Sequence, residues 1–366
     1  MKIINIVTQM EGGGAQSAAI RLSQGLVDRG YQVETWFLYL KRPTYLGRTG
    51  VRVLLGHPPR HFGDIFLIFI RLMRNLKRKS PDAVITFTHY ANILGQLAAW
   101  FSGIQCRVAS QRNPSWSYPW VARRVDWLLG TLGLYKENIM VSEAVKLSFR
   151  GYPAAYRRGG CVVHNGIQFQ PSFLGQKQSR TLFSLPINFP LVVTIGRLAL
   201  QKNQALLIRS LPLLPGVHLA IAGDGELLYE LQKEAQELGV RDRVHFLGEI
   251  LPSDVKDLLN AADIFAMPSR FEGLSNAILE AIGAGVPVIA SDIPSQIEVL
   301  GMGNQMPCGV LVPPDELPAW VNVIQQLCYD KKLRQEFSKR AKARSAEFTV
   351  KKMIAGFERA ILRAKG

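Results

Sequence analysis

The sequence predicts an α/β fold built from two Rossmann-like, doubly wound domains in tandem. Its 366 residues are a length typical of two domains, and the 48% of hydrophobic residues suffice for two large cores. Short apolar segments alternate with amphipathic stretches, and this alternation runs through the chain twice. Parallel sheets covered by helices on both faces are the structures that this alternation predicts.

The first domain is expected over residues 1–167. The apolar run Ile3–Val7 is followed by three glycines, which is typical of a buried strand that turns into a helix. Gly30 is placed to end that helix. Further strands are expected at Val33–Leu38, Ala83–Phe87, Arg107–Ala109, Asn138–Val141 and Cys161–Val163.

A proline-bearing stretch, 168–190, is expected as a linker to a second domain over 191–345. We expect residues 346–366 to form a C-terminal helix that packs back towards the N-terminal domain. The expected elements of the second domain are strands at Leu191–Ile195, Val217–Ala222, Arg243–Leu247, Ile264–Met267 and Pro287–Ser291, and helices at about Leu227–Leu238 and Ser275–Ala284.

The net charge of +16 is distributed unevenly. Residues 1–170 have a balance of +14, residues 171–330 one of −7, and residues 331–366 one of +9. A strong positive charge suggests a partner of opposite sign, which is a nucleic acid, an anionic membrane surface or a phosphorylated substrate. Charge alone does not choose among them.

Several features favour a cytoplasmic protein. The four cysteines are too scattered for a disulfide framework or a thiolate zinc site. The N-terminus lacks the apolar core and cleavage site of a signal peptide, and the longest apolar run, Ile65–Ile70, is too short to cross a bilayer.

Two glycine-rich loops follow predicted strands, but neither completes a dinucleotide fingerprint. Ser17 and Leu228 stand where the third glycine of G-x-G-x-x-G is required, after Gly12–Gly14 and Gly223–Gly225. A nicotinamide cofactor is therefore not expected. Tight structural turns and anion-binding loops at helix N-termini both remain open.

The segment 269–280 is the most informative part of the chain. Glu272 is expected in a loop, Ser275 as an N-cap, and Glu280 about one turn into the helix that follows. The N–H groups of Gly273 and Leu274, just before the helix, suit a phosphate, and two carboxylates beside them suit hydroxyl groups. This combination suits a sugar nucleotide, although the same residues are also compatible with two solvated surface carboxylates that bind nothing.

An ordered set of motifs resembles glycosyltransferase family four, the retaining enzymes of GT-B fold also called glycosyl transferases group one. The motifs are Gly196-Arg197-Leu198, Lys202-Asn203, Gly223-Asp224-Gly225, and Glu272 with Glu280. The resemblance implies two domains that face each other across a cleft, with the nucleotide-sugar donor mainly on the C-terminal domain and the acceptor on the N-terminal one.

The resemblance also implies roles for individual residues. Arg197 and Lys202 would hold the donor diphosphate, which agrees with the need to stabilise charge on a leaving nucleoside diphosphate. Glu272 would contact the donor sugar, Glu280 the ribose, and His89 would lie near the donor sugar and the reaction centre. The remaining donor-binding positions implied are Gly13, Gly14, Gly196, Gly223, Phe246, Leu247, Gly273 and Leu274.

Neither a metal nor a cofactor is expected. There is no His-Glu-x-x-His, and the acid pair Asp224 and Glu226 is not an Asp-x-Asp divalent site. In the family that the motifs resemble, the acceptor attacks the face from which the leaving group departs, and a donor phosphate oxygen takes the acceptor proton. We therefore assign no side chain as general base.

Residues 62–79 form a basic amphipathic pattern that predicts contact with an anionic membrane, although an ordinary helix with one core face has the same pattern. Arg112, Arg123 and Arg124 lie among tryptophans and are candidate acceptor-binding residues. The tryptophans alone are equally typical of a core.

We therefore expect a retaining, metal-independent transferase that moves a hexose or N-acetylhexosamine, most consistent with a UDP donor, to a saccharide acceptor in polysaccharide or glycan biosynthesis. A lipid-linked acceptor and a peripheral position on the inner face of the cell membrane are expected. A nucleotide-sugar epimerase of the same fold and a basic nucleic-acid-binding protein are the alternatives. No nucleic-acid-binding signature accompanies the charge.

Overall fold

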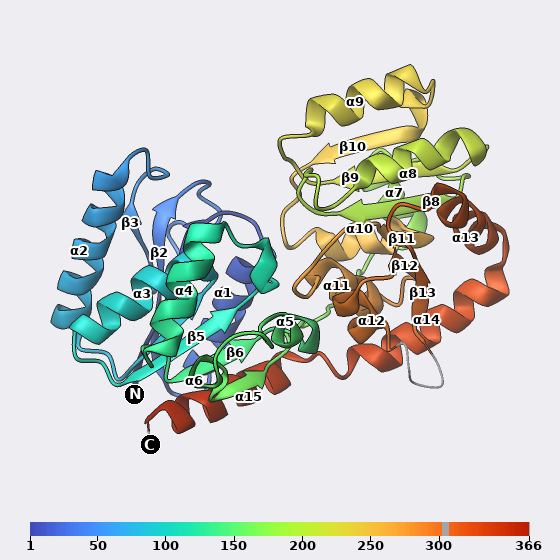
Figure 1. The fold of residues 1–366 in the computed structure, drawn as a ribbon. Coiled ribbons are helices and arrows are strands. Elements are labelled where there is room, and N and C mark those ends of the chain that lie inside the picture. Colours follow the sequence, from blue (N-terminus) through green and yellow to red (C-terminus); the bar gives the residue numbers. More distant parts are fainter. Residues whose placement is uncertain (302–306, 366) are drawn as a thin grey trace. The chain divides into compact units, whose positions relative to one another are not determined.

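The computed structural model describes residues 1–301 and 307–365, and the chain divides into two compact α/β units. Unit 1 comprises residues 1–166 together with the segment from Thr349 onward, and unit 2 comprises residues 167–348. Each unit has one parallel β-sheet with helices on both faces (Figure 1). The predicted fold class, two doubly wound α/β domains, is confirmed.

The sheet of unit 1 has seven strands in the order β3-β2-β1-β4-β5-β6-β7, all paired in parallel. These are β1 (Lys2–Met10), β2 (Gln32–Leu40), β3 (Val51–Leu55), β4 (Ala83–Phe87), β5 (Cys106–Gln111), β6 (Glu137–Met140) and β7 (Gly160–Val162). Strands β2 and β3 extend the sheet on one side of β1, and strands β4 to β7 extend it on the other side. The point between β1 and β4 is therefore a topological switch point.

Alternate residues of β1 face two different helical layers. Ile3 and Val7 point into a core shared with two helices, α1 (Gly14–Val27) and α15 (Val350–Lys365). Ile4 and Ile6 point into a core shared with two others, α2 (Phe62–Lys79) and α3 (His89–Phe101). The helices of unit 1 are α1 (Gly14–Val27), α2 (Phe62–Lys79), α3 (His89–Phe101), α4 (Trp120–Thr131), α5 (Glu143–Ser148), α6 (Ala154–Arg157), α15 (Val350–Lys365) and the 3₁₀ turn η1 (Ser115–Ser117).

Unit 2 has a six-stranded parallel sheet in the order β10-β9-β8-β11-β12-β13, so its switch point lies between β8 and β11. Its strands are β8 (Leu191–Ile195), β9 (His218–Ala222), β10 (Val244–Gly248), β11 (Ile264–Met267), β12 (Val288–Ser291) and β13 (Gly309–Val312). Its helices are α7 (Gln176–Leu182), α8 (Gln204–Ser210), η2 (Leu211–Leu213), α9 (Leu228–Glu237), η3 (Arg241–Arg243), α10 (Val255–Ala261), α11 (Asn276–Ala284), α12 (Pro294–Leu300), α13 (Leu317–Tyr329) and α14 (Lys331–Ser345).

The stretch 168–190, which the sequence predicts as a linker, is folded as part of unit 2 and contains α7. Its buried anchor is Arg180, whose guanidinium donates to Asp263 at 2.7 Å and to the carbonyl of Ala261 at 3.0 Å. Further bonds run from Arg180 to the carbonyls of Pro186, Ile187 and Phe189. A buried cation with this many partners fixes the stretch to the body of unit 2. The range 191–345 predicted for the second domain also includes 302–306, which lie outside the described residues.

The C-terminal segment packs on unit 1, against the sheet face that also carries α1. Phe357 of α15 stacks on Phe87 of β4 with ring centroids 5.8 Å apart. At Gly25 of α1 a Cβ atom would stand 2.0 Å from the Ile354 side chain of α15. The Ile354 side chain therefore packs directly on the backbone of α1 at this glycine. Unit 1 therefore depends on residues from both ends of the chain.

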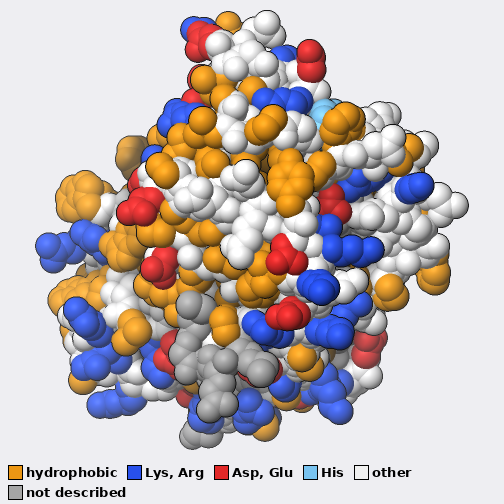
Figure 2. Space-filling view, turned by 90° about the vertical axis from the view of Figure 1, so that its right-hand side faces the viewer, with side chains coloured by type: hydrophobic (Ala, Val, Ile, Leu, Met, Phe, Trp, Pro, Cys, Tyr) orange, Lys and Arg blue, Asp and Glu red, His pale blue; other side chains and the backbone are white. Residues whose placement is uncertain are grey.

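The positive net charge belongs entirely to unit 1, since unit 2 is slightly acidic. Unit 1 has 27 basic and 9 acidic side chains, a balance of +18, whereas unit 2 has 17 and 19, a balance of −2. Figure 2 shows one face of the molecule, on which acidic and basic side chains mix among apolar ones and lysines and arginines gather in the lower half.

We expect Phe357→Ala to lower the free energy of unfolding of unit 1 by about 3–5 kcal/mol, because a fully buried aromatic ring is replaced by a cavity. Leu362→Ala on the same helix is the matched control, since Leu362 is exposed. Urea unfolding followed by circular dichroism measures both. Equal effects of the two changes would contradict the packing of α15 described here.

Candidate functional site

The strongest candidate site in unit 2 lies at its switch point, where the strands β8 and β11 end. The loop after β8 carries Arg197 and Lys202, and the loop after β11 carries Glu272. Ligands of open parallel α/β sheets bind at such points, because the two loops diverge there and leave a crevice at the carboxyl edge. The fold therefore brings together residues that are about 70 positions apart in the sequence.

Lys202 and Glu272 are in direct contact. The Lys202 ammonium donates to Glu272 Oε1 at 2.5 Å, and the Ser269 hydroxyl donates to the same oxygen at 2.8 Å. Glu272 is buried and Lys202 is half-buried, so the pair is largely removed from solvent. A cation and a carboxylate held side by side can bind a phosphate and a hydroxyl of one ligand.

Backbone bonds hold the two loops together around this pair. The Arg270 N–H donates to the carbonyl of Gln201 at 2.8 Å, and Gln201 Nε2 donates to the carbonyl of Phe271 at 2.9 Å. These bonds fix the spacing of Lys202 and Glu272. Such preorganisation is what a binding site for a charged group needs.

The glycines of the motifs allow three strand-end loops to approach closely. Gly223 has φ +139°, and a Cβ atom there would stand 2.0 Å from the carbonyl oxygen of Gly196. A Cβ at Gly225 would stand 2.3 Å from the carbonyl oxygen of Leu198, and the Gly223 N–H donates to the carbonyl of Gly248 at 2.7 Å. A side chain at Gly223 or Gly225 would separate the loops after β8, β9 and β10. For these glycines the structural-turn interpretation is sufficient.

The segment after β11 has the predicted conformation. Ser275 is the N-cap of α11, and its hydroxyl accepts the Ile278 N–H at 3.4 Å. Gly273 and Leu274 are buried in the loop before it, and no acidic residue lies in the first turn of α11. The positive end of the helix dipole therefore faces the Glu272 loop, and the first turn of the helix itself adds no carboxylate. Glu280 follows in the second turn and is half-buried.

The other residues predicted in unit 2 lie along the same sheet edge. Arg197 is exposed, and its carbonyl accepts a bond from Gln204 Nε2 at 2.9 Å. Phe246 and Leu247 are half-buried at the end of β10, where the Arg241 guanidinium lies 5.6 Å from the Phe246 ring centre. A flat, partly open apolar surface of this kind suits the face of a base.

In unit 1, His89 is the first residue of α3 and stands at the switch point between β1 and β4. Its imidazole lies against Tyr118 and Tyr90, with ring centroids 4.5 and 4.1 Å away. Both ring nitrogens are buried, and neither has a hydrogen-bond partner among the described residues. Burial lowers the pKa of His89 to about 4, so the ring is neutral at physiological pH. A neutral imidazole with unpaired nitrogens is suited to bonding a ligand hydroxyl.

Thr88, directly before His89, holds a strained backbone. Its φ of +74° is rare for a β-branched residue, and it is the N-cap of α3. Thr8 at the end of β1 supports this geometry: its hydroxyl lies 2.5 Å from that of Thr88 and accepts the Ala91 N–H at 3.1 Å. No local sequence pattern indicates either threonine, because the contact joins residues 80 positions apart.

Gly13 and Gly14 begin α1 at the same carboxyl edge of the unit 1 sheet. Gly13 is the N-cap, and the first turn of α1 carries no acidic side chain. A Cβ at Gly13 would stand 2.6 Å from Gln16 Oε1. A helix of 14 residues with a glycine N-cap and no carboxylate in its first turn has the features of an anion-binding N-terminus.

The three arginines proposed for acceptor binding lie in different environments. Arg112 is buried, donates to Asn165 Oδ1 and to Ser110 Oγ, and lies 5.7 Å from the Phe87 ring centre. Burial lowers its pKa to about 9. Arg123 is half-buried and Arg124 exposed on α4. Arg112 therefore supports the interior of unit 1, and only the two α4 arginines face solvent.

Two further properties concern the described residues as a whole. They contain no group of three or more His, Cys, Asp or Glu side chains placed to hold a metal ion. None of their helices is both long enough and apolar enough to span a bilayer.

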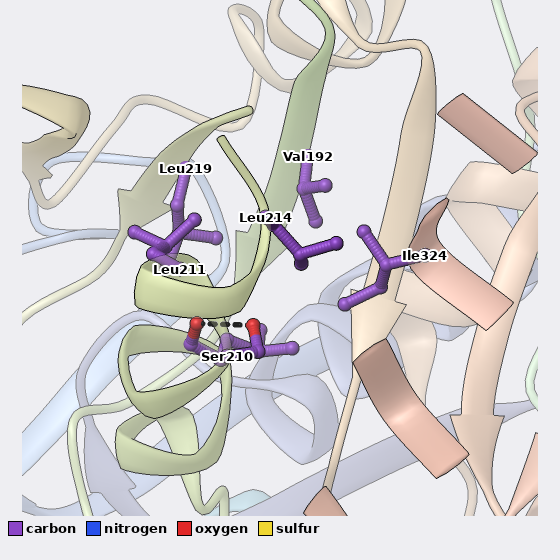
Figure 3. A pocket seen from close by; sticks show the side chains of 7 residues that line it. Val192, Ser210, Leu211, Leu214, Leu219 and Ile324 are labelled. Carbon is purple, nitrogen blue, oxygen red and sulfur yellow. Dashed lines mark hydrogen bonds between the residues drawn. The ribbon is translucent and has the colours of Figure 1, made fainter. Parts of the chain in front are cut away.

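The apolar pocket in Figure 3 lies in the core of unit 2 between α8, η2 and α13, and the only bond drawn there is from Ser210 Oγ to the Leu207 carbonyl. Its lining offers no charged group, so it is a packing gap and not a substrate site.

Comparison with known protein families accounts for most of the chain. The model described as Glycosyltransferase Family 4 matches residues 12–170, and the model described as Glycosyl transferases group 1 matches residues 178–344. The chain belongs to these family 4, group 1 glycosyltransferases. The predicted family and the predicted enzyme class are thereby confirmed.

Individual relatives are distant. A lipopolysaccharide core biosynthesis glycosyltransferase, LpsE of Rhizobium meliloti, is 28% identical over 252 residues, which is 64% of this chain and 71% of the relative. The UDP-Gal:alpha-D-GlcNAc-diphosphoundecaprenol alpha-1,3-galactosyltransferase of Escherichia coli is 27% identical over 291 residues, covering 72% and 70%. Among solved structures, Anabaena HepE in complex with UDP and glucose superimposes with a TM-score of 0.86 at 22% identity, over 98% of both chains. That likeness shows the GT-B fold.

The buried neutral state of His89 predicts a specific pH dependence of stability. The unfolded state protonates His89 near pH 6.5, whereas the native state resists protonation down to about pH 4. Between these values the unfolded state binds more protons, so stability falls as the pH falls, by about 3 kcal/mol at pH 4. His89→Gln should remove this contribution, as measured by urea unfolding from pH 7.5 to 4.

His61→Gln is the matched control, because the His61 side chain is 70% exposed. An unchanged pH profile in His89→Gln would show that His89 is not buried as a neutral ring.

Proposed function

We propose that this glycosyltransferase is a retaining, metal-independent enzyme that transfers a hexose or N-acetylhexosamine from a UDP-sugar to a saccharide acceptor. The observation that carries the proposal is the Lys202 and Glu272 pair at the switch point of unit 2, directly before the N-terminus of α11. The Lys202 cation and the dipole of α11 suit a diphosphate, and the Glu272 carboxylate suits sugar hydroxyls.

In this proposal the donor lies along the carboxyl edge of the unit 2 sheet. Lys202 and the exposed Arg197 bind the diphosphate, together with the N–H groups of Gly273 and Leu274. Glu280, half-buried in α11, accepts the ribose hydroxyls, and Phe246 with Leu247 lies against the base. The Lys202 ammonium donates to Glu272 Oε1, so a diphosphate that binds Lys202 competes with this contact and leaves Glu272 Oε1 to accept a sugar hydroxyl. We infer that binding of the two donor parts is coupled through this exchange.

The proposed chemistry proceeds with retention at the anomeric carbon. The bond from C1 to the phosphate oxygen breaks, the acceptor hydroxyl oxygen bonds to C1 on the same face, and the phosphate oxygen takes the acceptor proton. Lys202 and Arg197 stabilise the charge that develops on the leaving diphosphate. His89, neutral and with both nitrogens unpaired among the described residues, accepts or donates a bond to a donor sugar hydroxyl without carrying charge.

The two cations take the place that a divalent ion would have beside a leaving diphosphate, and on this basis we propose that neither metal nor cofactor is needed. Transfer in the presence of a chelator should proceed at the rate measured without it. A rate that falls with chelator and recovers with added magnesium or manganese would contradict this part of the proposal.

We propose a lipid-linked saccharide as acceptor, in polysaccharide or glycan assembly at the inner face of the cell membrane, with unit 1 in contact with an anionic lipid surface. Two relatives support this choice through their names, one in lipopolysaccharide core biosynthesis and one acting on a diphosphoundecaprenol-linked sugar. The charge balance of +18 in unit 1 supports the membrane contact. The family match favours transfer over epimerisation and over nucleic-acid binding.

Lys202→Ala should lower kcat by about 10²–10³-fold, because one fixed donor to the leaving group is lost. Glu280→Ala should raise the KM for the UDP-sugar, because the ribose contacts are lost in ground state and transition state alike. Initial rates with a panel of UDP-sugars, and circular dichroism to confirm folding, measure both effects.

Lys233→Ala is the matched control, since Lys233 forms an exposed surface pair with Glu237 on α9. Wild-type rates in Lys202→Ala would overturn the site assignment. NMR of the product's anomeric proton tests retention, and inversion would contradict the proposed chemistry.

A further inference from the structure

The imidazole of His89 lacks the hydrogen bond that usually orients a functional histidine. Both of its ring nitrogens are buried, and neither has a hydrogen-bond partner among the described residues. A histidine ring has broad freedom about its outer side-chain torsion, and a bond from one nitrogen to a carbonyl or carboxylate ordinarily selects one orientation. The orientation of the His89 ring must therefore come from the side chains that pack against it.

Two tyrosine rings contact this imidazole, and they differ in how firmly they are held. Tyr90 follows His89 in α3 and is 44% exposed. Tyr118, directly after η1, is buried, and its ring lies at 27° to the imidazole with centroids 4.5 Å apart. Because only Tyr118 is enclosed by the protein, it is the contact that can fix the plane of the imidazole.

A buried glutamine ties Tyr118 to the helix that carries His89. Gln111 Oε1, at the end of β5, accepts the Tyr118 hydroxyl at 3.0 Å. The same oxygen accepts Asn92 Nδ2 at 3.1 Å, and Asn92 lies in the first turn of α3, as His89 does. One oxygen atom thus sets the spacing between the stacking ring and the helical turn that carries the imidazole.

Asp126 of α4 fixes which way the Gln111 amide points. Tyr135 and Tyr156 donate hydroxyl bonds to its carboxylate at 2.9 and 2.6 Å, and Gln111 Nε2 donates to Oδ1 at 3.3 Å. Burial raises the pKa of Asp126 to about 6, so the carboxylate is ionised at neutral pH and can only accept. The nitrogen end of the amide must therefore face Asp126, and the oxygen end faces Tyr118.

We propose that Tyr118 is the positioning residue of His89: its ring holds the imidazole in the orientation that bonds a donor sugar hydroxyl, and Gln111 and Asp126 hold Tyr118. The inference rests on the proposed function for its effect on transfer, whereas the orientation of the ring is measurable without substrate. Tyr118 acts only through His89, so its effect on transfer must disappear when the imidazole is absent.

Proton NMR reads the ring contact in the free protein. Cross-relaxation between the imidazole protons of His89 and the ring protons of residue 118 should be strong in the wild type and in Tyr118→Phe, which keeps the ring. His89→Ala identifies the imidazole resonances by their absence. Asp126→Asn keeps every aromatic ring but places a donor where the network needs an acceptor, so it should weaken the cross-relaxation and move the His89 resonances.

The effect on transfer is measured as a double-mutant cycle. Tyr118→Leu should lower kcat about tenfold and Asp126→Asn about threefold, because the imidazole is no longer held, and Tyr118→Phe should stay within about twofold of the wild type. In the His89→Ala background, Tyr118→Leu should change kcat by less than about twofold.

Trp36→Leu is the matched control, because it removes a fully buried ring of unit 1 from the core cluster beside α2, outside this network. It should leave both kcat and the His89 resonances unchanged. Circular dichroism checks the folding of every variant.

An equal loss of kcat from Tyr118→Leu with and without His89 would overturn the proposal, because Tyr118 would then have a structural role only. Unchanged cross-relaxation in Asp126→Asn would overturn the part assigned to Gln111 and Asp126. Wild-type protein that has the expected ring contact but transfers sugar from no UDP-sugar would contradict the proposed function and leave the position of the ring confirmed.

Discussion

The reversal of strand order within each parallel sheet is the constraint on which the rest of this structure depends. In unit 2 the chain leaves β8 for β9 on one side and returns to β11 on the other, so the loops after β8 and β11 diverge at the carboxyl edge. The first loop brings Lys202 and the second brings Glu272, and the two side chains meet at 2.5 Å. In unit 1 the same reversal brings Thr8 after β1 to Thr88 after β4, which sets the start of α3 and the position of His89. Both sets of candidate residues follow from one topological rule.

Close backbone approach makes this arrangement rigid in unit 2. Gly223 and Gly225 allow the loops after β8 and β9 to touch through main-chain atoms, and hydrogen bonds from Gly196 to Ala222 and from Gly223 to Gly248 extend the contact to β10. A site assembled from backbone loses little conformational entropy when a ligand binds, because the N–H groups are already ordered. The motif glycines thus act through packing, and the charged side chains beside them supply the chemistry.

Much of the fold is predictable from the sequence because buried parallel strands are short, apolar and β-branched. Ala83–Phe87, Leu191–Ile195 and Ile264–Met267 have the predicted bounds. The strands β3 and β13 were missed, and both are edge strands whose partly exposed residues give no continuous apolar run. The assignment of residues 168–190 to unit 2 depends on a contact of the same long-range kind, since Arg180 is anchored by Asp263, 83 positions away.

The candidate site was predictable only where motifs are contiguous. Residues 269–280 contain Glu272, the N-cap Ser275 and Glu280 in one stretch, so local rules suffice for its conformation. The support of His89 by Thr8 and the burial of Arg112 depend on contacts across 80 and 53 positions, and arginine is ordinarily exposed. The tryptophans of α4 had two interpretations, and their exposure in the structure favours a surface role over a core one.

The most direct test of the central claim is a thermal-shift comparison of UDP, GDP, NAD and a short RNA, each with chelator present. A ligand at 100 times its dissociation constant adds about 2.7 kcal/mol to the stability of the native state, which such a measurement resolves. We expect stabilisation by UDP that is lost in Lys202→Ala and kept in Lys233→Ala. Stabilisation by NAD or RNA in place of UDP, or UDP stabilisation that survives Lys202→Ala, would contradict the assignment of the donor site to Lys202 and Glu272.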